Sequence, residues 1–321
     1  MEGAAAVPRR WTLRLGVVAA CAVVGAVAAC GTSSPGGTGD SAAGGSAAGR
    51  KITVVAAENF WGSIAAQLGG ARVTVTSIID NPDADPHDYE PTPADGRAIA
   101  DARLFIDNGV GYDPWAAKLV AANPTDGRTV LTVGDLVGAT DGDNPHRWYN
   151  PGDVAKVIDT VTADYKKIDP ADAGYFDQQR TSFTATTLKP YTDVIATIRT
   201  TYGGTPVGAS ESIFAMLTPA LGLDLLTPPA FLRAISEGTD PTATDKATID
   251  DQIKGKKIKV YVYNSQNATP DVQRQVEEAK AAGIPVTTIT ETLTPAGTSF
   301  QDWQVAQLEG LRAALAQATG K

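Results

Sequence analysis

The chain has 321 residues, of which 43% are hydrophobic and 20% are charged, a composition that fits a globular protein of more than one domain. Its formal net charge of −9 at pH 7 argues against a nucleic-acid partner and against electrostatic binding to anionic lipid. Both cysteines, Cys21 and Cys30, lie near the N-terminus, so the rest of the chain has no disulfide framework.

Residues 1–30 have the pattern of an export signal. Three arginines form a basic region, and the apolar run LGVVAACAVVGAVAAC follows at 15–30, which is too short for a comfortable membrane-spanning helix. The run ends in VAAC and is similar to a bacterial lipoprotein signal, which implies that Cys30 is lipidated and becomes the new N-terminus. Cleavage before Cys21 would leave too short an apolar region. An uncleaved anchor or a plain secretory peptide is the alternative.

Residues 31–50, GTSSPGGTGDSAAGGSAAGR, are rich in glycine, serine and alanine. A segment of this composition cannot bury a core, so we expect a flexible tether. Signal, cysteine and tether together predict an extracytoplasmic domain that is lipid-anchored to the cell membrane.

Strands and helices alternate from residue 51 onward. Strands are expected at 51–57, 72–79, 102–109 and 128–135, and the segments NFWGSIAAQLGG and ADGRAIAD between them read as helices. This order is typical of a parallel sheet with helices on both faces. The pattern restarts with strands at 205–210, 257–264 and 284–291. The sequence therefore predicts an α/β fold with two lobes.

The junction between the lobes has helical periodicity and no strand signal. We expect an N-terminal lobe at 51–168, one long connecting helix at 169–203 with a kink near Pro190, and a C-terminal lobe at 204–321. A single helical connection predicts limited hinge motion when a ligand binds.

Four candidate ligands follow the ends of expected strands: His87, His146, Glu211 and Glu291. Ligands of open parallel sheets bind beyond the carboxyl ends of the strands, so these side chains are expected to meet in one cleft. Two imidazoles and two carboxylates suit a divalent first-row metal. The lack of thiolates disfavours Cu(I), and the imidazoles disfavour Ca²⁺ and Mg²⁺.

Each candidate also has a plainer interpretation. The histidines could be loop residues that face water, and Glu291 could be a surface carboxylate. Glu211 could be an acidic residue favoured by the dipole in the first turn of a helix that begins near Ser210. Glu58, at the end of the first expected strand, could replace Glu291 as a ligand or lie behind it.

Three segments, DPHDYEPTPAD, ARLFIDNGVGYDPW and NPHRWYNPGDV, resemble the metal-binding family of solute-binding lipoproteins, which deliver manganese, zinc or iron(II) to ATP-driven importers. The resemblance covers about residues 51–318. It implies two α/β lobes around a long helix, and a monomer that hands its metal to a membrane permease and is not an enzyme. It also implies four metal ligands: His87, His146, Glu211 and Glu291.

Departures from the family pattern bear on which metal is carried. Glu291 stands where an aspartate is usual, and no histidine-rich loop precedes His146. Two imidazoles with two carboxylates therefore favour Mn²⁺ or Fe²⁺ over Zn²⁺, although zinc binds most such sites more tightly in vitro. Asn150 replaces a common aspartate and is expected to cap a helix.

The aromatic residues near these motifs are expected to have structural roles. Trp61, Trp115 and Trp148 should pack around the cleft, and Tyr89 should close the pocket or fix its loop.

Two other functions compete with metal delivery. An exported metalloenzyme would need an open coordination position and a general base, and four protein ligands leave neither. An adhesin-like lipoprotein with a degenerate metal site would keep the fold without the affinity.

Overall fold

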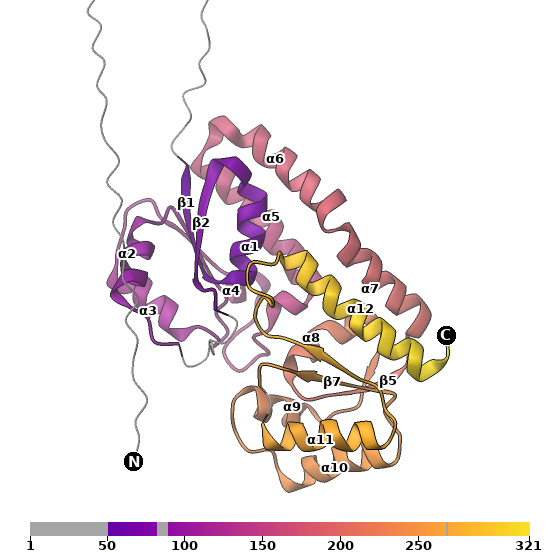
Figure 1. The fold of residues 1–321 in the computed structure, drawn as a ribbon. Coiled ribbons are helices and arrows are strands. Elements are labelled where there is room, and N and C mark those ends of the chain that lie inside the picture. The colour runs from indigo at the N-terminus through magenta and orange to yellow at the C-terminus, as the bar shows by residue number, and fades with distance from the viewer. Residues whose placement is uncertain (1–50, 82–88, 268) are drawn as a thin grey trace, which may run out of the picture. The chain divides into compact units, whose positions relative to one another are not determined.

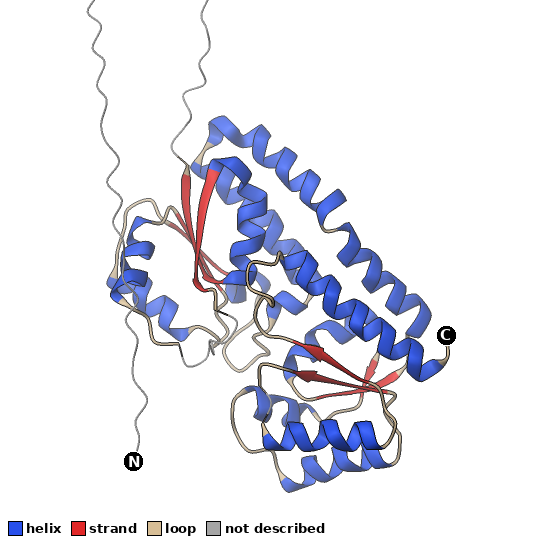
Figure 2. Cartoon of the chain, in the orientation of Figure 1, coloured by secondary structure: helices blue, strands red, loops and turns tan. Residues whose placement is uncertain are grey.

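A computed structural model describes residues 51–81, 89–267 and 269–321. The export signal with Cys30, the tether and the predicted ligand His87 lie outside the described residues. The described part contains two four-stranded sheets, each with its own set of helices (Figures 1 and 2). All strand pairs in both sheets are parallel, so the α/β prediction is confirmed.

The sheet of the N-terminal lobe has the strand order β2-β1-β3-β4. Its strands are β1 Ile52–Glu58, β2 Val73–Ile79, β3 Leu104–Asp107 and β4 Thr129–Thr132. Successive residues of β1 enter different apolar clusters, with Val54 and Ala56 on one face and Val55 and Ala57 on the other. Both faces of the sheet are therefore buried, which explains why its central strands read as continuous apolar runs.

Helices cover both faces of this sheet (Figure 1). They are α1 Asn59–Gly69, η1 Gly70–Arg72, α2 Pro93–Asp101, α3 Pro114–Ala122, α4 Val133–Val137, η2 Arg147–Tyr149 and α5 Pro151–Ile168. Helices α1 and α5 pack on the face of Val54, whereas α2 and α3 pack on the face of Val55.

The sheet of the C-terminal lobe has the order β6-β5-β7-β8. Its strands are β5 Pro206–Ala209, β6 Asp224–Leu225, β7 Val260–Asn264 and β8 Val286–Ile289. Its helices are α8 Ser212–Leu221, α9 Pro229–Ser236, α10 Ala243–Lys254, α11 Pro270–Ala281 and α12 Phe300–Thr319. Strand β6 was missed by the sequence analysis because two residues are too few to show a periodicity.

Several predicted strands were too long, among them those expected at 102–109, 128–135 and 284–291. The strand expected at 128–135 stops at Thr132, and helix α4 begins at the next residue. Beyond the end of β4, the amide of Gly134 donates to the carbonyl oxygen of Asn108 at 2.8 Å.

The connection between the lobes is nearly continuous helix. It comprises the short η3 Pro170–Asp172, α6 Ala173–Ser182, the π-helical turn η4 Phe183–Thr187 and α7 Lys189–Tyr202. The helical hydrogen bonding is interrupted at Leu188, two residues before Pro190. Proline has no amide to donate, so the interruption lies where the sequence predicted it.

A second bridge between the lobes was not foreseen. Helix α12 packs along α7 and then reaches α1 of the N-terminal lobe (Figure 1). The side chains of Gln67 and Gln301 form two reciprocal hydrogen bonds of 3.0 and 2.9 Å. The amide of Phe300 donates to the hydroxyl of Ser63 at 2.9 Å. The C-terminal lobe is therefore connected to the N-terminal lobe twice, by the chain that enters it from α7 and by the contacts of α12 with α1.

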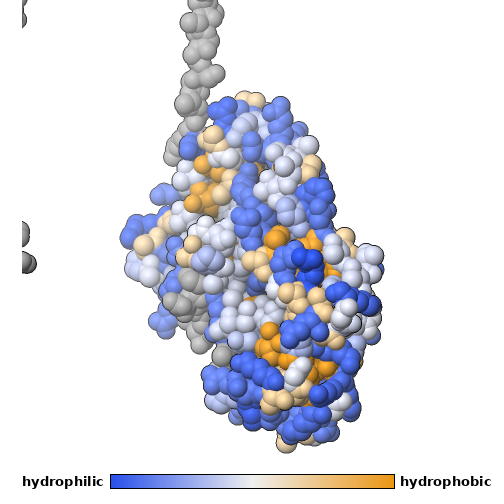
Figure 3. Space-filling model, turned by 45° about the vertical axis from the view of Figure 1, so that its right-hand side comes forward, coloured by the Kyte–Doolittle hydropathy of each residue, from blue (hydrophilic) through white to orange (hydrophobic). Residues whose placement is uncertain are grey.

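The surface is largely polar. The face in Figure 3 is dominated by hydrophilic residues, with apolar ones gathered in separate patches. Among the described residues, the exposed large hydrophobic side chains are Val130 and Leu226. Also within this part of the chain, no helix has both the length and the apolar character needed to cross a membrane.

Candidate metal site

His146 lies in the loop between α4 and η2 and is completely buried. The interpretation that it faces water is therefore wrong. Its ring meets Trp148 edge-on at 5.3 Å and Tyr112 at 6.1 Å between ring centroids. Trp148 in turn stacks on Phe60 at 3.9 Å. These aromatic rings fix the imidazole and keep water from one side of it.

Glu291 brings a carboxylate of the C-terminal lobe to this histidine. Its Oε1 lies 3.3 Å from Nε2 of His146, and 12% of its side chain is exposed. Glu291 is therefore not a surface carboxylate without partners. The two residues are 145 positions apart in sequence, so this contact depends on how the lobes are joined.

The loop that carries Glu291 is held by several hydrogen bonds. Gln266 Oε1 accepts from the amides of Glu291 at 2.7 Å and Thr292 at 3.1 Å. The hydroxyl of Tyr149 donates to the carbonyl oxygen of Thr290 at 2.6 Å. The glutamate therefore stands on a fixed backbone, as a metal ligand requires.

Tyr112 also lies at this site. It is part of the motif NGVGYDPW, but no role was predicted for it from the sequence. Burial raises its pKa well above the usual value, and the charge of Glu291 raises it further. The hydroxyl therefore stays protonated, and Tyr112 places a neutral O–H group within electrostatic reach of the Glu291 carboxylate.

Glu211 immediately precedes α8 and is also buried, with 1% of its surface exposed. The interpretation that it lies in the first turn of a helix beginning near Ser210 is wrong, because α8 begins at Ser212 and Glu211 is its N-cap residue. Its backbone is extended, with φ −141° and ψ 164°, and its Oε2 accepts from Nδ2 of Asn264 at 3.1 Å. Its neighbour Ser212 places a hydroxyl 3.3 Å from Nδ1 of His146. Both carboxylates of the C-terminal lobe thus follow strand ends near one imidazole.

Glu58 has different neighbours. It ends β1, is fully buried, and its pKa is raised well above the usual value, first by burial and then by the charges of Asp113 and Asp107. The raised pKa favours the protonated form of Glu58, and Asp113 is its electrostatic neighbour.

Asp113 uses its carboxylate to hold a tight turn. Its oxygens accept from the amides of Asn108 at 2.7 Å and Gly109 at 2.8 Å. The turn passes through positive φ at Gly109, Val110 and Gly111, and such a φ is strained for a β-branched residue such as Val110. Nδ2 of Asn108 donates to the carbonyl oxygen of Pro145 at 2.9 Å. The acidic cluster therefore supports the loop of His146 from behind.

Smaller predictions are confirmed. Asn150 caps α5 by accepting from the amides of Gly152 and Asp153. The three tryptophans expected to pack are buried. The hydroxyl of Tyr89 donates to Asp95 at 3.0 Å and its ring packs on Trp115, so this residue fixes its loop to α2 and α3.

The family described as "Zinc-uptake complex component A periplasmic" matches residues 54–314. The chain belongs to this family. Its membership confirms the resemblance found in the sequence motifs, and it confirms that the chain is an uptake component and not an enzyme.

Proteins similar to this chain include ones named for manganese and one named for zinc. The manganese-binding lipoprotein MntA of Halalkalibacterium halodurans is 31% identical over 127 residues, which are 38% of this chain and 41% of that protein. The manganese ABC transporter substrate-binding lipoprotein PsaA of Streptococcus mitis is 24% identical over 70% of this chain and 76% of its own length. The high-affinity zinc uptake system protein ZnuA of Bacillus subtilis is 26% identical over 55% and 58%.

Solved structures share the fold of the zinc-uptake family. The manganese-bound periplasmic metal binding protein of Candidatus Liberibacter asiaticus has a TM-score of 0.69 at 20% identity, covering 83% of this chain and all of that one. A crystal structure of ZnuA has a TM-score of 0.66 at 19% identity, covering 84% and 99%. These structures support the two-lobe architecture.

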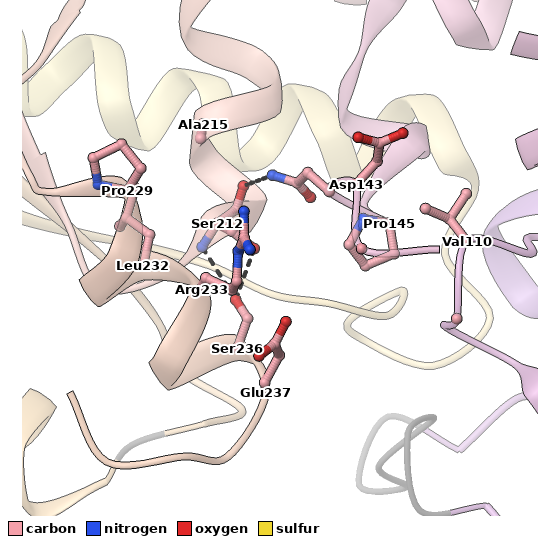
Figure 4. A pocket seen from close by; sticks show the side chains of 13 residues that line it. Val110, Asp143, Pro145, Ser212, Ala215, Pro229, Leu232, Arg233, Ser236 and Glu237 are labelled. Carbon is pink, nitrogen blue, oxygen red and sulfur yellow. Dashed lines mark hydrogen bonds between the residues drawn. The ribbon is translucent and has the colours of Figure 1, made fainter. Parts of the chain in front are cut away.

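A cavity of about 300 Å³ in this member of the zinc-uptake family is lined by Asn144 and Pro145, the two residues that precede His146. Its walls come from both lobes: Val110 and Pro145 face Ser212, Ser236 and Leu232 across it (Figure 4). Among the described residues alone, no three His, Cys, Asp or Glu side chains are grouped so that they could hold a metal ion.

Proposed function

We propose that the chain is an extracytoplasmic, lipid-anchored binding protein that captures a divalent transition metal and delivers it to the permease of an ATP-driven importer. The observation that supports this most directly is the contact between the lobes, in which Nε2 of His146 lies 3.3 Å from Oε1 of Glu291 in a buried setting. Family membership and the metals named for the relatives support the same role.

The proposed metal ligands are His87, His146, Glu211 and Glu291. The first lobe would supply the nitrogens and the second the oxygens, so the metal would bridge the lobes. Imidazole nitrogen and carboxylate oxygen both suit Mn²⁺, Fe²⁺ and Zn²⁺. Two carboxylates also offset the charge of the cation in a region from which the aromatic rings exclude water.

The cargo we favour is Mn²⁺ or Fe²⁺ over Zn²⁺, because half of the proposed ligands are hard oxygens. The anchor would be a lipid on Cys30, followed by the tether at 31–50. We further propose that the folded part acts as a monomer with lobes at 51–168 and 204–321, joined at 169–203.

Calorimetric titration with Mn²⁺ and Zn²⁺ tests the proposal. The parent should bind one ion, and Glu291→Ala should lose most of the affinity. Glu58→Gln is the matched control: it also changes a buried glutamate, but one whose partner is Asp113 and not His146. A parent that binds neither ion, or a Glu291→Ala variant that binds as the parent does, would contradict the proposal.

A further inference from the structure

The side of His146 away from Glu291 is enclosed by a polar network. Nδ1 lies 2.8 Å from Oδ1 of Asn144 and 3.3 Å from Oγ of Ser212. Ser212 is itself held by Ser236 of α9, which accepts from the Ser212 amide at 3.1 Å and lies 2.9 Å from its hydroxyl. Figure 4 shows these bonds between Ser212 and Ser236, both of which line the cavity.

The orientation of the Asn144 amide is fixed from both ends. Its Nδ2 donates to the carbonyl oxygen of Ser212 at 2.6 Å, and a carbonyl oxygen can only accept. Its Oδ1 accepts from the backbone amide of His146 at 3.1 Å, and an amide N–H can only donate. Because neither neighbour tolerates a flipped amide, the oxygen of Asn144 must face the imidazole.

This orientation decides where the imidazole carries its proton. The oxygen of Asn144 has no hydrogen to donate, so the 2.8 Å contact is a hydrogen bond only if Nδ1 bears the hydrogen. A neutral imidazole has one N–H, which leaves a lone pair on Nε2. That nitrogen lies 3.3 Å from Oε1 of Glu291, and the two atoms share a hydrogen only when the ring carries both protons or the carboxyl carries one. In the neutral ring the lone pair is directed at this space instead.

We propose that Asn144 and Ser212, the latter held by Ser236, are positioning residues that keep His146 in its Nδ1–H tautomer and so present the lone pair of Nε2 to the space between the lobes. This inference rests on the proposed function in one respect only: the metal that the lone pair would bind. The network also links α9 to the histidine, because Ser236 is the last residue of that helix.

Nitrogen-15 labelling of histidine gives a direct test, because the chain has only two histidines. His87→Gln leaves one imidazole to observe. Long-range proton–nitrogen correlation spectra of the metal-free protein at about pH 9, where ordinary imidazoles with a pKa of ~6.5 are neutral, should show a protonated Nδ1 and a bare Nε2. In the same background, Asn144→Leu should give a mixture of the two tautomers.

A conservative variant separates positioning from a purely structural role. Asn144→Asp and Asn144→Leu both lose the Nδ2 donor to Ser212, but only the aspartate keeps an acceptor facing Nδ1. We expect Asn144→Asp to retain the Nδ1–H tautomer. If the two variants behave alike, Asn144 serves only to hold Ser212, and the inference is wrong.

Metal titration of the variants with His87 in place provides a second readout. Removing outer-shell partners of a metal-binding histidine typically costs roughly 10–100-fold in affinity, and we expect Asn144→Leu to lie in that range for Zn²⁺. Ser212→Ala should lose less, because its contact with Nδ1 is longer. Unchanged affinity together with an unchanged tautomer would overturn the inference. A parent with the expected tautomer that binds no metal would support it and contradict the proposed function.

Discussion

Buried carboxyl groups occur in both lobes of this protein, but their surroundings differ. In the N-terminal lobe Glu58, Asp107 and Asp113 are electrostatic neighbours, and burial raises the pKa of all three. In the C-terminal lobe Glu211 accepts from Asn264, and Glu291 faces an imidazole and a tyrosine hydroxyl. Asp113 of the first group accepts from amides of its own lobe, whereas Glu291 of the second group faces the histidine of the other lobe.

This difference shows that burial alone does not identify a metal ligand. Glu58 is as buried as Glu211 and stands at the end of a strand. What separates them is the partner: Glu58 lies among acids that raise its pKa and favour its neutral form, whereas Glu211 accepts from the side-chain amide of Asn264. The acid cluster instead holds the turn at 108–113 and, through Asn108, the loop of His146.

The largest expected effect comes from removing charge from the C-terminal group. Glu211→Gln keeps the volume of the side chain but removes its charge, so metal should no longer raise the melting temperature. For the parent at about a thousand times the dissociation constant, the stabilisation is about 4 kcal/mol. Thermal melting with and without Mn²⁺ measures it, with Glu58→Gln as the control that should keep the shift. If metal raises the melting temperature of both variants equally, the buried carboxyl groups of the two lobes do not differ in metal binding.

A second effect follows from the imidazoles. Protons compete with the metal for their nitrogens, so metal affinity should fall by more than roughly tenfold between pH 8 and pH 5. Titration of the protein with Mn²⁺ at a series of pH values measures this. An affinity that stays constant over the range would rule out the histidine ligands.

The N-terminal group predicts a pH effect of its own on the metal-free protein. Burial and Asp113 raise the pKa of Asp107 from 3.8 to about 7. The folded state therefore holds more protons than the unfolded chain between these values, and the free energy of unfolding should fall as the pH rises through them. Urea unfolding at pH 5 and pH 8 measures the fall.

Asp107→Asn should reduce the fall in the free energy of unfolding between pH 5 and pH 8. The asparagine keeps a side-chain oxygen that can accept from the hydroxyl of Thr132, which donates to Asp107 at 2.9 Å. The exposed Asp101→Asn is the matched control and should leave the fall unchanged. If the free energy of unfolding of Asp107→Asn falls between pH 5 and pH 8 as steeply as that of the parent, Asp107 is not the group that holds the extra proton.

The smallest expected effect is on overall shape. The lobes are joined by α6–η4–α7 and again by α12, whose Gln301 is hydrogen-bonded to Gln67. Metal loss should therefore change loops and lobe tilt only slightly. Small-angle scattering with and without metal should give nearly the same radius of gyration. A large increase without metal would mean that the lobes move independently and that the contact of His146 with Glu291 is transient.

The sequence by itself determined the class of fold and the chemistry of the candidate ligands. Apolar runs in alternation with helical periodicity specify parallel α/β lobes, because strands buried on both faces must be apolar throughout. The position of His146, Glu211 and Glu291 after strand ends follows from the same pattern. Their assignment as metal ligands, with His87, stays a prediction. The break in the connecting helix near Pro190 was also predictable from the local sequence, because proline lacks the N–H that a helical hydrogen bond needs.

The tertiary structure decided which strand-end carboxyls face the histidine. His146 meets Glu291 across 145 positions and Ser212 across 66, and neither distance in sequence leaves a local signal. The same holds for Tyr112, for the return of α12 to α1, and for the turning of Glu58 toward Asp113. Periodicity reports only which face of an element is buried, whereas the hydrogen-bond partner of a buried polar group depends on how distant elements pack against one another.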